Sequence, residues 1–228
     1  MKEKTHHIPQ PMYIHIIPGH QYDSNIYVVT GKIPTIIDTG TGLYHHNILN
    51  QIKEFIDPSK IKQIILTHEH FDHTGGVKKL YEQTEGNAQI IAHAYASKKI
   101  ENGDSFFAEL LGGEMPKMPV DLKLSGNETL QVGDEMFLVL STPGHTPGCI
   151  CLYSEKSKTL FSGDTVFAHG SYGRYDFPGG NLTQLKESLR LLHVLDVESL
   201  YPGHEEIVEK DGKRHIRLSL QNIESIKY

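Results

Sequence analysis

The chain has 228 residues, 38% of them hydrophobic, and a formal net charge of −6, which suits one α/β domain with an apolar core over residues 1–228. Because lysine and arginine form no cluster, the sequence argues against a nucleic-acid-binding surface. It has no apolar stretch long enough to span a membrane and no signal-peptide core near Met1, so we expect a cytoplasmic protein without a membrane partner.

Short β-branched runs alternate with amphipathic stretches along the chain. The runs predict strands at residues 26–29, 35–37, 61–66, 89–92, 136–140, 149–153, 159–161 and 199–201. Apolar stripes predict helices through Ile48 and Ile52, after the N-cap Asn181, and through Ile216 and Ile223. This mixture predicts β-sheet covered by helices.

The stretch from Ser97 to Pro119 differs from its surroundings, because glycine and proline are interspersed with large apolar residues. It is interpreted either as an insertion that covers a site or as a packed connecting loop.

The segment at residues 67–76, THEHFDHTGG, follows a predicted strand directly. It places four potential metal ligands within six residues: His68, His70, Asp72 and His73. Neutral imidazole and carboxylate are ligands that divalent zinc accepts. A tight turn at this point can direct alternate side chains toward different centres.

Three later strand ends carry further candidate ligands. His145 stands in a turn stiffened by glycine and proline, Asp164 follows the strand at 159–161, and His204 follows the strand at 199–201. Open α/β sheets build their sites where strands give way to loops. A lone histidine of this kind is more often structural, but three such strand ends and the 67–76 segment together predict a metal site.

These motifs resemble those of the metallo-β-lactamase superfamily, and within it the glyoxalase II-type thioesterases, over the span from Asp38 to His204. The resemblance implies a four-layer αβ/βα sandwich with metal ions at one edge of its two sheets. It implies one ion held by His68, His70 and His145, and another by Asp72, His73 and His204, with Asp164 bridging both.

Asp38 matches the acidic residue that lies near the metals in this family, where it would orient a histidine ligand. Diiron relatives that reduce oxygen or nitric oxide carry a glutamate where this chain has His70, so two zinc ions are favoured, with iron or manganese as alternatives. Two such ions lower the pKa of a shared water from about 15.7 toward neutrality and yield a bridging hydroxide that attacks the substrate carbonyl. Asp72 and Asp164 are therefore the expected catalytic carboxylates, and Asp72 would help orient the nucleophile.

The segment GRYDFPGG at residues 173–180 resembles one in small glyoxalase II-like proteins. Arg174 offers a planar fork suited to a substrate carboxylate, but it equally fits a local pair with Asp176. Arg174 and Tyr175 are the candidate substrate-binding residues.

The function expected from the resemblance is hydrolysis of S-lactoylglutathione or a similar acyl thioester, with a small-molecule substrate as the partner. A persulfide dioxygenase with one iron is the alternative, and a lactonase assisted by Tyr172 or Tyr175 is a weaker one. Cys149 and Cys151 would share one face of a strand, where a disulfide is strained, so we expect reduced buried thiols. The oligomeric state stays open.

Overall fold

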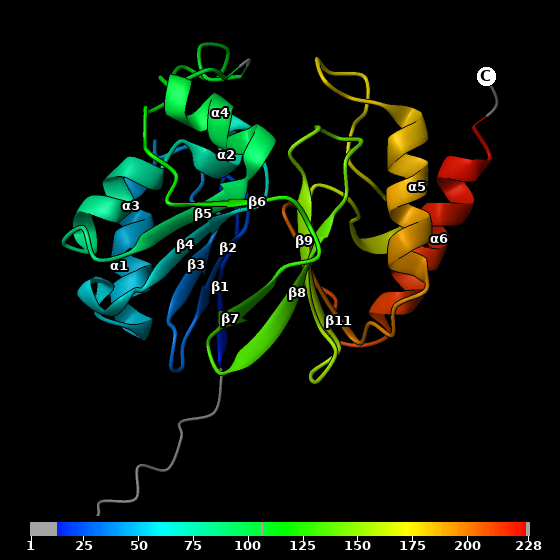
Figure 1. Ribbon diagram of the computed structural model, residues 1–228, viewed down its shortest axis with the longest axis horizontal. Helices are drawn as coiled ribbons and strands as arrows, with labels where there is room; N and C mark the ends of the chain where they lie inside the picture. Colours follow the sequence, from blue (N-terminus) through cyan, green and yellow to red (C-terminus); the bar gives the residue numbers. More distant parts are fainter. Residues whose placement is uncertain (1–12, 106, 227–228) are drawn as a thin grey trace, which may run out of the picture.

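The computed structural model describes residues 13–105 and 107–226, and it arranges them as two β-sheets packed face to face (Figure 1). The first sheet has the order β1 (Ile14–Ile17), β2 (Ile26–Val29), β3 (Thr35–Ile37), β4 (Gln63–Leu66), β5 (Gln89–His93) and β6 (Leu122–Leu124). The second has the order β11 (Ser199–Pro202), β10 (Thr159–Gly163), β9 (Ile150–Ser154), β8 (Glu135–Ser141) and β7 (Thr129–Val132).

The pairing direction places the carboxyl ends of several strands at one edge. β3, β4, β5 and β6 run parallel, and β10 runs parallel to β11 in the other sheet. The remaining pairs are antiparallel. Loops that leave the parallel strands therefore emerge together, as the predicted site requires.

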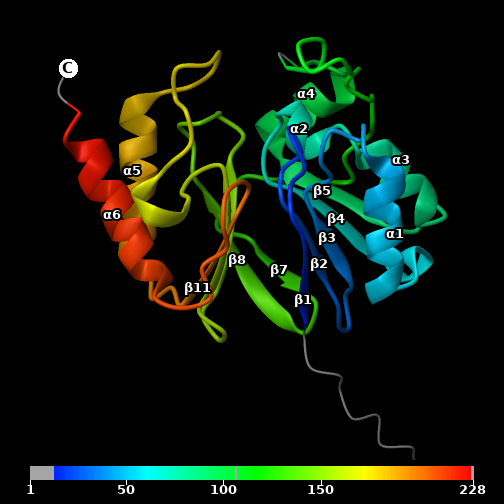
Figure 2. The same ribbon diagram turned by 180° about the vertical axis from the view of Figure 1, so that it is seen from behind.

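Helices cover the outer face of each sheet (Figures 1 and 2). The first sheet carries α1 (His45–Phe55), α2 (Phe71–Thr74), α3 (Val77–Gln83) and α4 (Ala94–Asn102), and the second carries α5 (Leu182–His193) and α6 (Gly212–Glu224). Short 3-10 turns lie at η1 (Pro58–Lys60) and η2 (Ala168–Gly170). The predicted N-cap is confirmed, because the Asn181 side chain accepts a hydrogen bond from the amide of Gln184 at 3.0 Å.

Three apolar clusters hold the layers together. One joins the helices α1 to α4 to the first sheet, and one joins α5 and α6 to the second. The third lies between the sheets, where Tyr27, Ile65 and Phe161 are each no more than 2% exposed. Helix, sheet, sheet and helix thus form four layers, and the expected αβ/βα sandwich is confirmed.

Residues 97–119 comprise the end of a helix and a packed loop. The first part belongs to α4, which ends at Asn102 and is capped by Gly103, whose left-handed φ of 68° glycine adopts without strain. Beyond it, Met115 and Met118 are buried against the first-sheet core. The packed-loop interpretation therefore holds for that part, while Phe107 reaches the candidate site described below.

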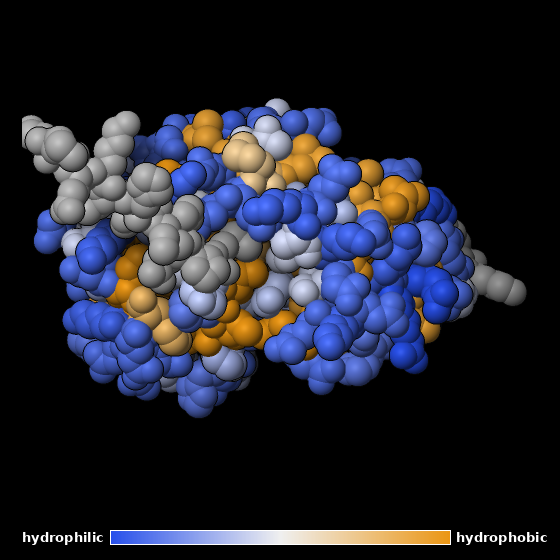
Figure 3. All heavy atoms as spheres, turned by 90° about the horizontal axis from the view of Figure 1, so that it is seen from below, coloured by the Kyte–Doolittle hydropathy of each residue, from blue (hydrophilic) through white to orange (hydrophobic). Residues whose placement is uncertain are grey.

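Among residues 13–105 and 107–226, no helix combines the length and the apolar character needed to cross a bilayer. Seen from below, hydrophilic residues cover most of the visible face, and apolar residues appear in separate patches (Figure 3).

Cys149 and Cys151 are both buried and unpaired, as expected. Burial raises the pKa of the Cys149 thiol well above its usual value, and it raises the pKa of Cys151 to about 11. A thiol that stays protonated is a poor nucleophile. We expect a disulfide reagent such as Ellman's reagent to leave both thiols unmodified in the folded protein and to titrate both after unfolding. Rapid modification of Cys149 in the folded state would contradict this packing role.

Candidate metal centre

Strand ends bring the predicted ligands to one edge of the sandwich. β4 ends at Leu66, and the chain then turns through His68 and His70 into α2, which carries Asp72 and His73. The other three follow the strands of the second sheet: His145 after β8, Asp164 after β10 and His204 after β11.

The first group of candidate ligands is His68, His70 and His145, each at most 7% exposed. Their nearest ring nitrogens lie within 4.8 Å of one another. His145 Nε2 lies 2.8 Å from His70 Nδ1, and the His68 ring stands nearly edge-on to the His145 ring with centroids 5.0 Å apart. Three imidazole nitrogens directed at one point can supply three of the four ligands of a zinc ion.

The second group is Asp72, His73 and His204. His204 Nε2 lies 3.0 Å from Asp72 Oδ2 and 3.2 Å from His73 Nε2. Asp72 and His204 are partly exposed, whereas His73 is fully buried. This group therefore faces solvent on one side, which leaves room for a water or a substrate.

Asp164 lies between the two groups. Its Oδ1 is 3.2 Å from His73 Nε2, and its Oδ2 is 3.4 Å from His145 Nε2 and 3.7 Å from His204 Nε2. One carboxylate thus contacts histidines of both groups. A carboxylate placed between two groups of ligands has an oxygen available to each group.

Asp38 orients one histidine of the second group. Its Oδ1 accepts a hydrogen bond from the amide of Thr67 at 2.8 Å, and its Oδ2 accepts one from the Thr67 hydroxyl. Oδ2 also lies 2.8 Å from His73 Nδ1, which leaves His73 Nε2 directed at the cluster. The Asp38 backbone is left-handed, with φ 59°, a conformation that aspartate tolerates better than most residues.

Two more histidines are oriented by groups that the sequence analysis did not identify. His145 Nδ1 lies 2.6 Å from the carbonyl oxygen of Arg174, and His68 Nδ1 lies 3.2 Å from Thr67 Oγ1. Metal-binding histidines typically donate their second N–H to such an oxygen. In each case Nε2 is free to face the cluster.

Two buried polar atoms of the cluster fit a cation. Within the part of the chain that the structure describes, His68 Nε2 has no hydrogen-bond partner, and Asp164 Oδ1 has none either, although His73 lies near it. Buried polar atoms are almost always paired in native proteins. A divalent ion would satisfy both atoms, so the residues present fit a metal site.

The two groups of candidate ligands differ in the protonation of their histidines. Burial lowers the pKa of His68 well below its usual value and that of His70 to about 3, so both imidazoles are neutral and ready to bind. For His73, burial is outweighed by Asp164 and Asp38, which hold its pKa well above the usual value. Burial would raise the pKa of Asp164, but His73 and His204 hold it well below its usual range.

Protons therefore compete with metal at the second group. The pKa of His204 is also raised, because Asp164 and Asp72 outweigh its burial. Since a ligating imidazole must lose this proton, and both pKa values lie above the usual 6.5, we expect metal affinity to rise as the pH rises above about 6.5. Calorimetric titration of the metal-free protein in two buffers of different ionisation enthalpy should show proton release. Equal heats in both buffers would contradict the protonated state of His73.

Glu69, between the first two ligands, is buried and ties two loops together. Its Oε2 accepts a hydrogen bond from the Thr146 hydroxyl at 3.0 Å, so the 67–76 turn is linked to the loop that carries His145. Burial raises its pKa to about 7. A β-carbon on Gly148 would lie 2.1 Å from this carboxylate, so the position requires glycine.

A cavity of about 590 Å³ opens over the metal ligands. Arg174 and Tyr172 line it. Tyr175, the other tyrosine of this segment, is not among the lining residues, although both tyrosines pack against the core of the second sheet. Arg174 makes a two-point pair with Asp176 at 3.0 and 2.6 Å, which is the local pairing that the sequence also allowed.

The other histidines lie outside the ligand groups. His169 Nε2 lies 2.6 Å from Glu206 Oε1, and the backbone amide of His169 donates a hydrogen bond to His215 Nδ1. His93 caps α4, and His45 and His46 lie at the start of α1. His6 and His7 lie outside the described residues.

Comparison with known proteins gives a family match over most of the chain. Residues 21–204 match the model of the metallo-beta-lactamase superfamily. The chain is 37% identical over 208 residues to "Probable metallo-hydrolase MJ0888" of Methanocaldococcus jannaschii, covering 88% of this chain and 96% of that one. It is 33% identical over 155 residues to a hydroxyacylglutathione hydrolase of Nitrosococcus oceani, covering 67% of this chain and 52% of the other.

Solved structures agree in fold. The B3 metallo-beta-lactamase BLEG-1 superposes with a TM-score of 0.75 at 29% identity, covering 89% of this chain and 96% of that one. The protein TTHA1623, crystallised in a di-iron-bound form, superposes with a TM-score of 0.72 at 31% identity, covering 91% and 96%.

Proposed function

The chain belongs to the metallo-β-lactamase superfamily, and on that premise we propose that it is a dinuclear metal-dependent hydrolase of acyl thioesters, the class of compounds that includes S-lactoylglutathione. One observation carries the proposal. Asp164 lies within 3.7 Å of histidines from both ligand groups, so two ions held by those groups would share it.

The candidate ligands would be shared between two ions according to the two groups described above. His68, His70 and His145 would hold one ion, while Asp72, His73 and His204 would hold the other. When bound, a pair of divalent ions polarises a carbonyl group and supplies a strong nucleophile near neutral pH. The nitrogen-rich donor set favours zinc, and iron or manganese are the alternatives.

The side chains around the ions would position the reactants. Burial would raise the pKa of Asp72, but His73 and His204 outweigh it, so the carboxylate is ionised. Its oxygen faces the cavity and can accept a hydrogen bond from a water molecule there, which fixes the direction of attack. Cys149 takes no part in this step, since it is buried and protonated.

The proposal is tested by elemental analysis of the purified protein together with a thioester panel. We expect about two ions per chain and hydrolysis that stops on chelation and returns with zinc. Zinc-loaded protein that leaves every thioester intact would contradict the proposal.

Metal analysis combined with oxygen-uptake and lactone assays separates the two alternative functions. A persulfide dioxygenase would contain one iron and consume oxygen with glutathione persulfide. A lactonase assisted by Tyr172, which lines the cavity, would open lactones faster than it cleaves thioesters.

A further inference from the structure

One wall of the cavity, beside the metal ligands, is apolar. Its residues come from three separated segments, and they are Phe107, Leu110 and Leu111, then Phe167, and then Phe177. Leu110 is 74% exposed, so a large apolar side chain faces the open cavity. Exposed apolar groups beside a polar centre mark a place where a ligand buries its own apolar part.

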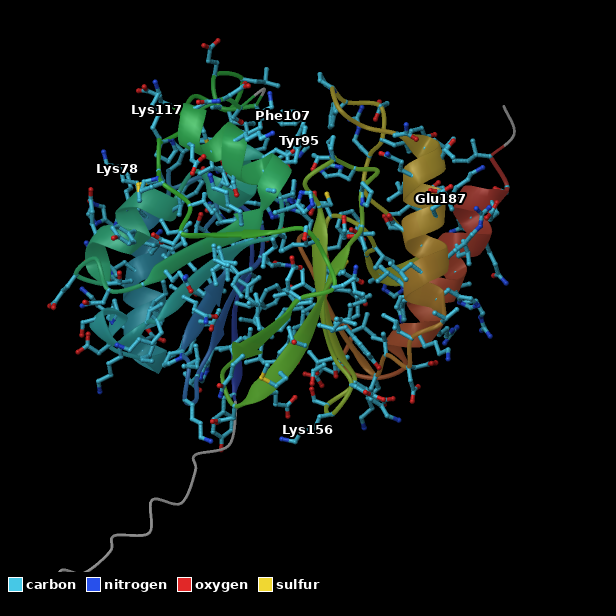
Figure 4. All side chains as sticks on the ribbon, viewed as in Figure 1. Lys78, Tyr95, Phe107, Lys117, Lys156 and Glu187 are labelled. Atoms are coloured by element: carbon cyan, nitrogen blue, oxygen red, sulfur yellow. The ribbon has the colours of Figure 1, made fainter. Side chains whose placement is uncertain are left out.

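Aromatic contacts hold this wall against the metal centre. The Phe107 ring stands edge-on to His70, with centroids 4.9 Å apart, and edge-on to Phe177, with centroids 4.8 Å apart. Phe107, which is labelled in Figure 4, therefore connects the loop after α4 to the loop before α5 through its contact with Phe177. The wall begins directly beside a candidate ligand, where the acyl carbon of a substrate would lie.

Away from the metal ligands, the cavity offers few charged groups to an anionic substrate. Asp72 and Asp164 would be neutralised by the ions that they hold, and among the other described lining residues the charged side chains are Arg174 and Glu205. The Arg174 guanidinium pairs with Asp176 and stacks on the Phe177 ring, 4.0 Å from its centroid. For the two carboxylates of glutathione, this part of the cavity therefore offers one cation, which is already paired with Asp176.

We propose that the wall formed by Phe107, Leu110, Leu111, Phe167 and Phe177 is an acyl subsite, and that the preferred substrates are thioesters or esters of apolar acyl groups rather than glutathione thioesters of small hydroxy acids. This inference rests on the proposed hydrolase activity and narrows its substrate class. Each methylene group buried in the subsite should raise kcat/KM about fourfold until the wall is covered.

The test uses zinc-loaded protein and N-acetylcysteamine thioesters from acetyl to octanoyl, compared with S-lactoylglutathione. We expect kcat/KM to rise with chain length and to exceed the value for S-lactoylglutathione. Leu110→Ser should reduce the ratio of octanoyl to acetyl activity by about tenfold. Leu191→Ser is the matched control, because Leu191 is 41% exposed on α5 and does not line the cavity.

Binding gives a readout that needs no turnover. The non-hydrolysable thioether N-acetyl-S-octylcysteamine should bind more tightly by calorimetry than its S-methyl analogue, and Leu110→Ser should reduce the ratio of the two affinities by about tenfold. A flat profile of rate against chain length, or S-lactoylglutathione as the best substrate, would overturn the acyl subsite while leaving the hydrolase intact. Absence of hydrolysis for every thioester, with octyl binding retained, would instead overturn the proposed function alone.

Discussion

Replacing Asp164 by asparagine is expected to lower kcat/KM by at least about a hundredfold and to reduce the bound metal to about one ion per chain or less. Asp164 lies between the two groups of ligands, with its oxygens 3.2 Å from His73 and 3.4 Å from His145. The amide has one oxygen and no charge, so it cannot serve two cations. The substitution also removes one of the negative charges that hold the pKa of His73 above its usual value.

Metal content by mass spectrometry and thioester hydrolysis measure this effect together. Asp196→Asn is the matched control, because Asp196 is an exposed carboxylate paired with Lys158 and lies outside the ligand groups. The bridging role would be refuted if Asp164→Asn retained two ions per chain.

The second large effect is expected at Asp38. Asp38→Asn keeps a side chain that tolerates the left-handed backbone, but it removes the charge and presents an amide where His73 Nδ1 needs an acceptor. Loss of such an orienting partner typically costs about 10- to 100-fold in metal affinity. We expect zinc affinity, measured by competition with a coloured chelator, to fall within that range.

Asp211→Asn is an apt control for this variant. Asp211 has nearly the same backbone conformation, with φ 61°, and lies exposed at the start of α6. Unchanged zinc affinity in Asp38→Asn, or an equal loss in Asp211→Asn, would show that Asp38 does not orient His73.

Much of the fold and of the ligand set could be predicted from the sequence because both depend on local patterns. Buried strands such as β2 and β3 are continuous apolar runs, and they occur where predicted. The ligand candidates follow strand ends, and the structure brings all seven together. Three strands were missed, namely β1, β6 and β7, since each is short and lies at or next to a sheet edge with partly exposed positions.

The groups that support the ligands could not be predicted, because they meet only through tertiary packing. The carbonyl oxygen of Arg174 reaches His145 across 29 residues, and the Phe107 and Phe177 rings meet from loops on different sheets. The motif also does not show which tyrosine lines the cavity: Tyr172 and Tyr175 both pack against the second-sheet cluster, and Tyr172 is the one among the cavity's lining residues.

A crystal structure of the zinc-soaked protein with anomalous data at the zinc edge tests the central claim most directly. Two peaks about 3.5–4 Å apart are predicted, one within bonding distance of His68, His70 and His145, the other of Asp72, His73 and His204, with Asp164 touching both. A single peak, or peaks that leave Asp164 without a bond to metal, would contradict a shared dinuclear centre.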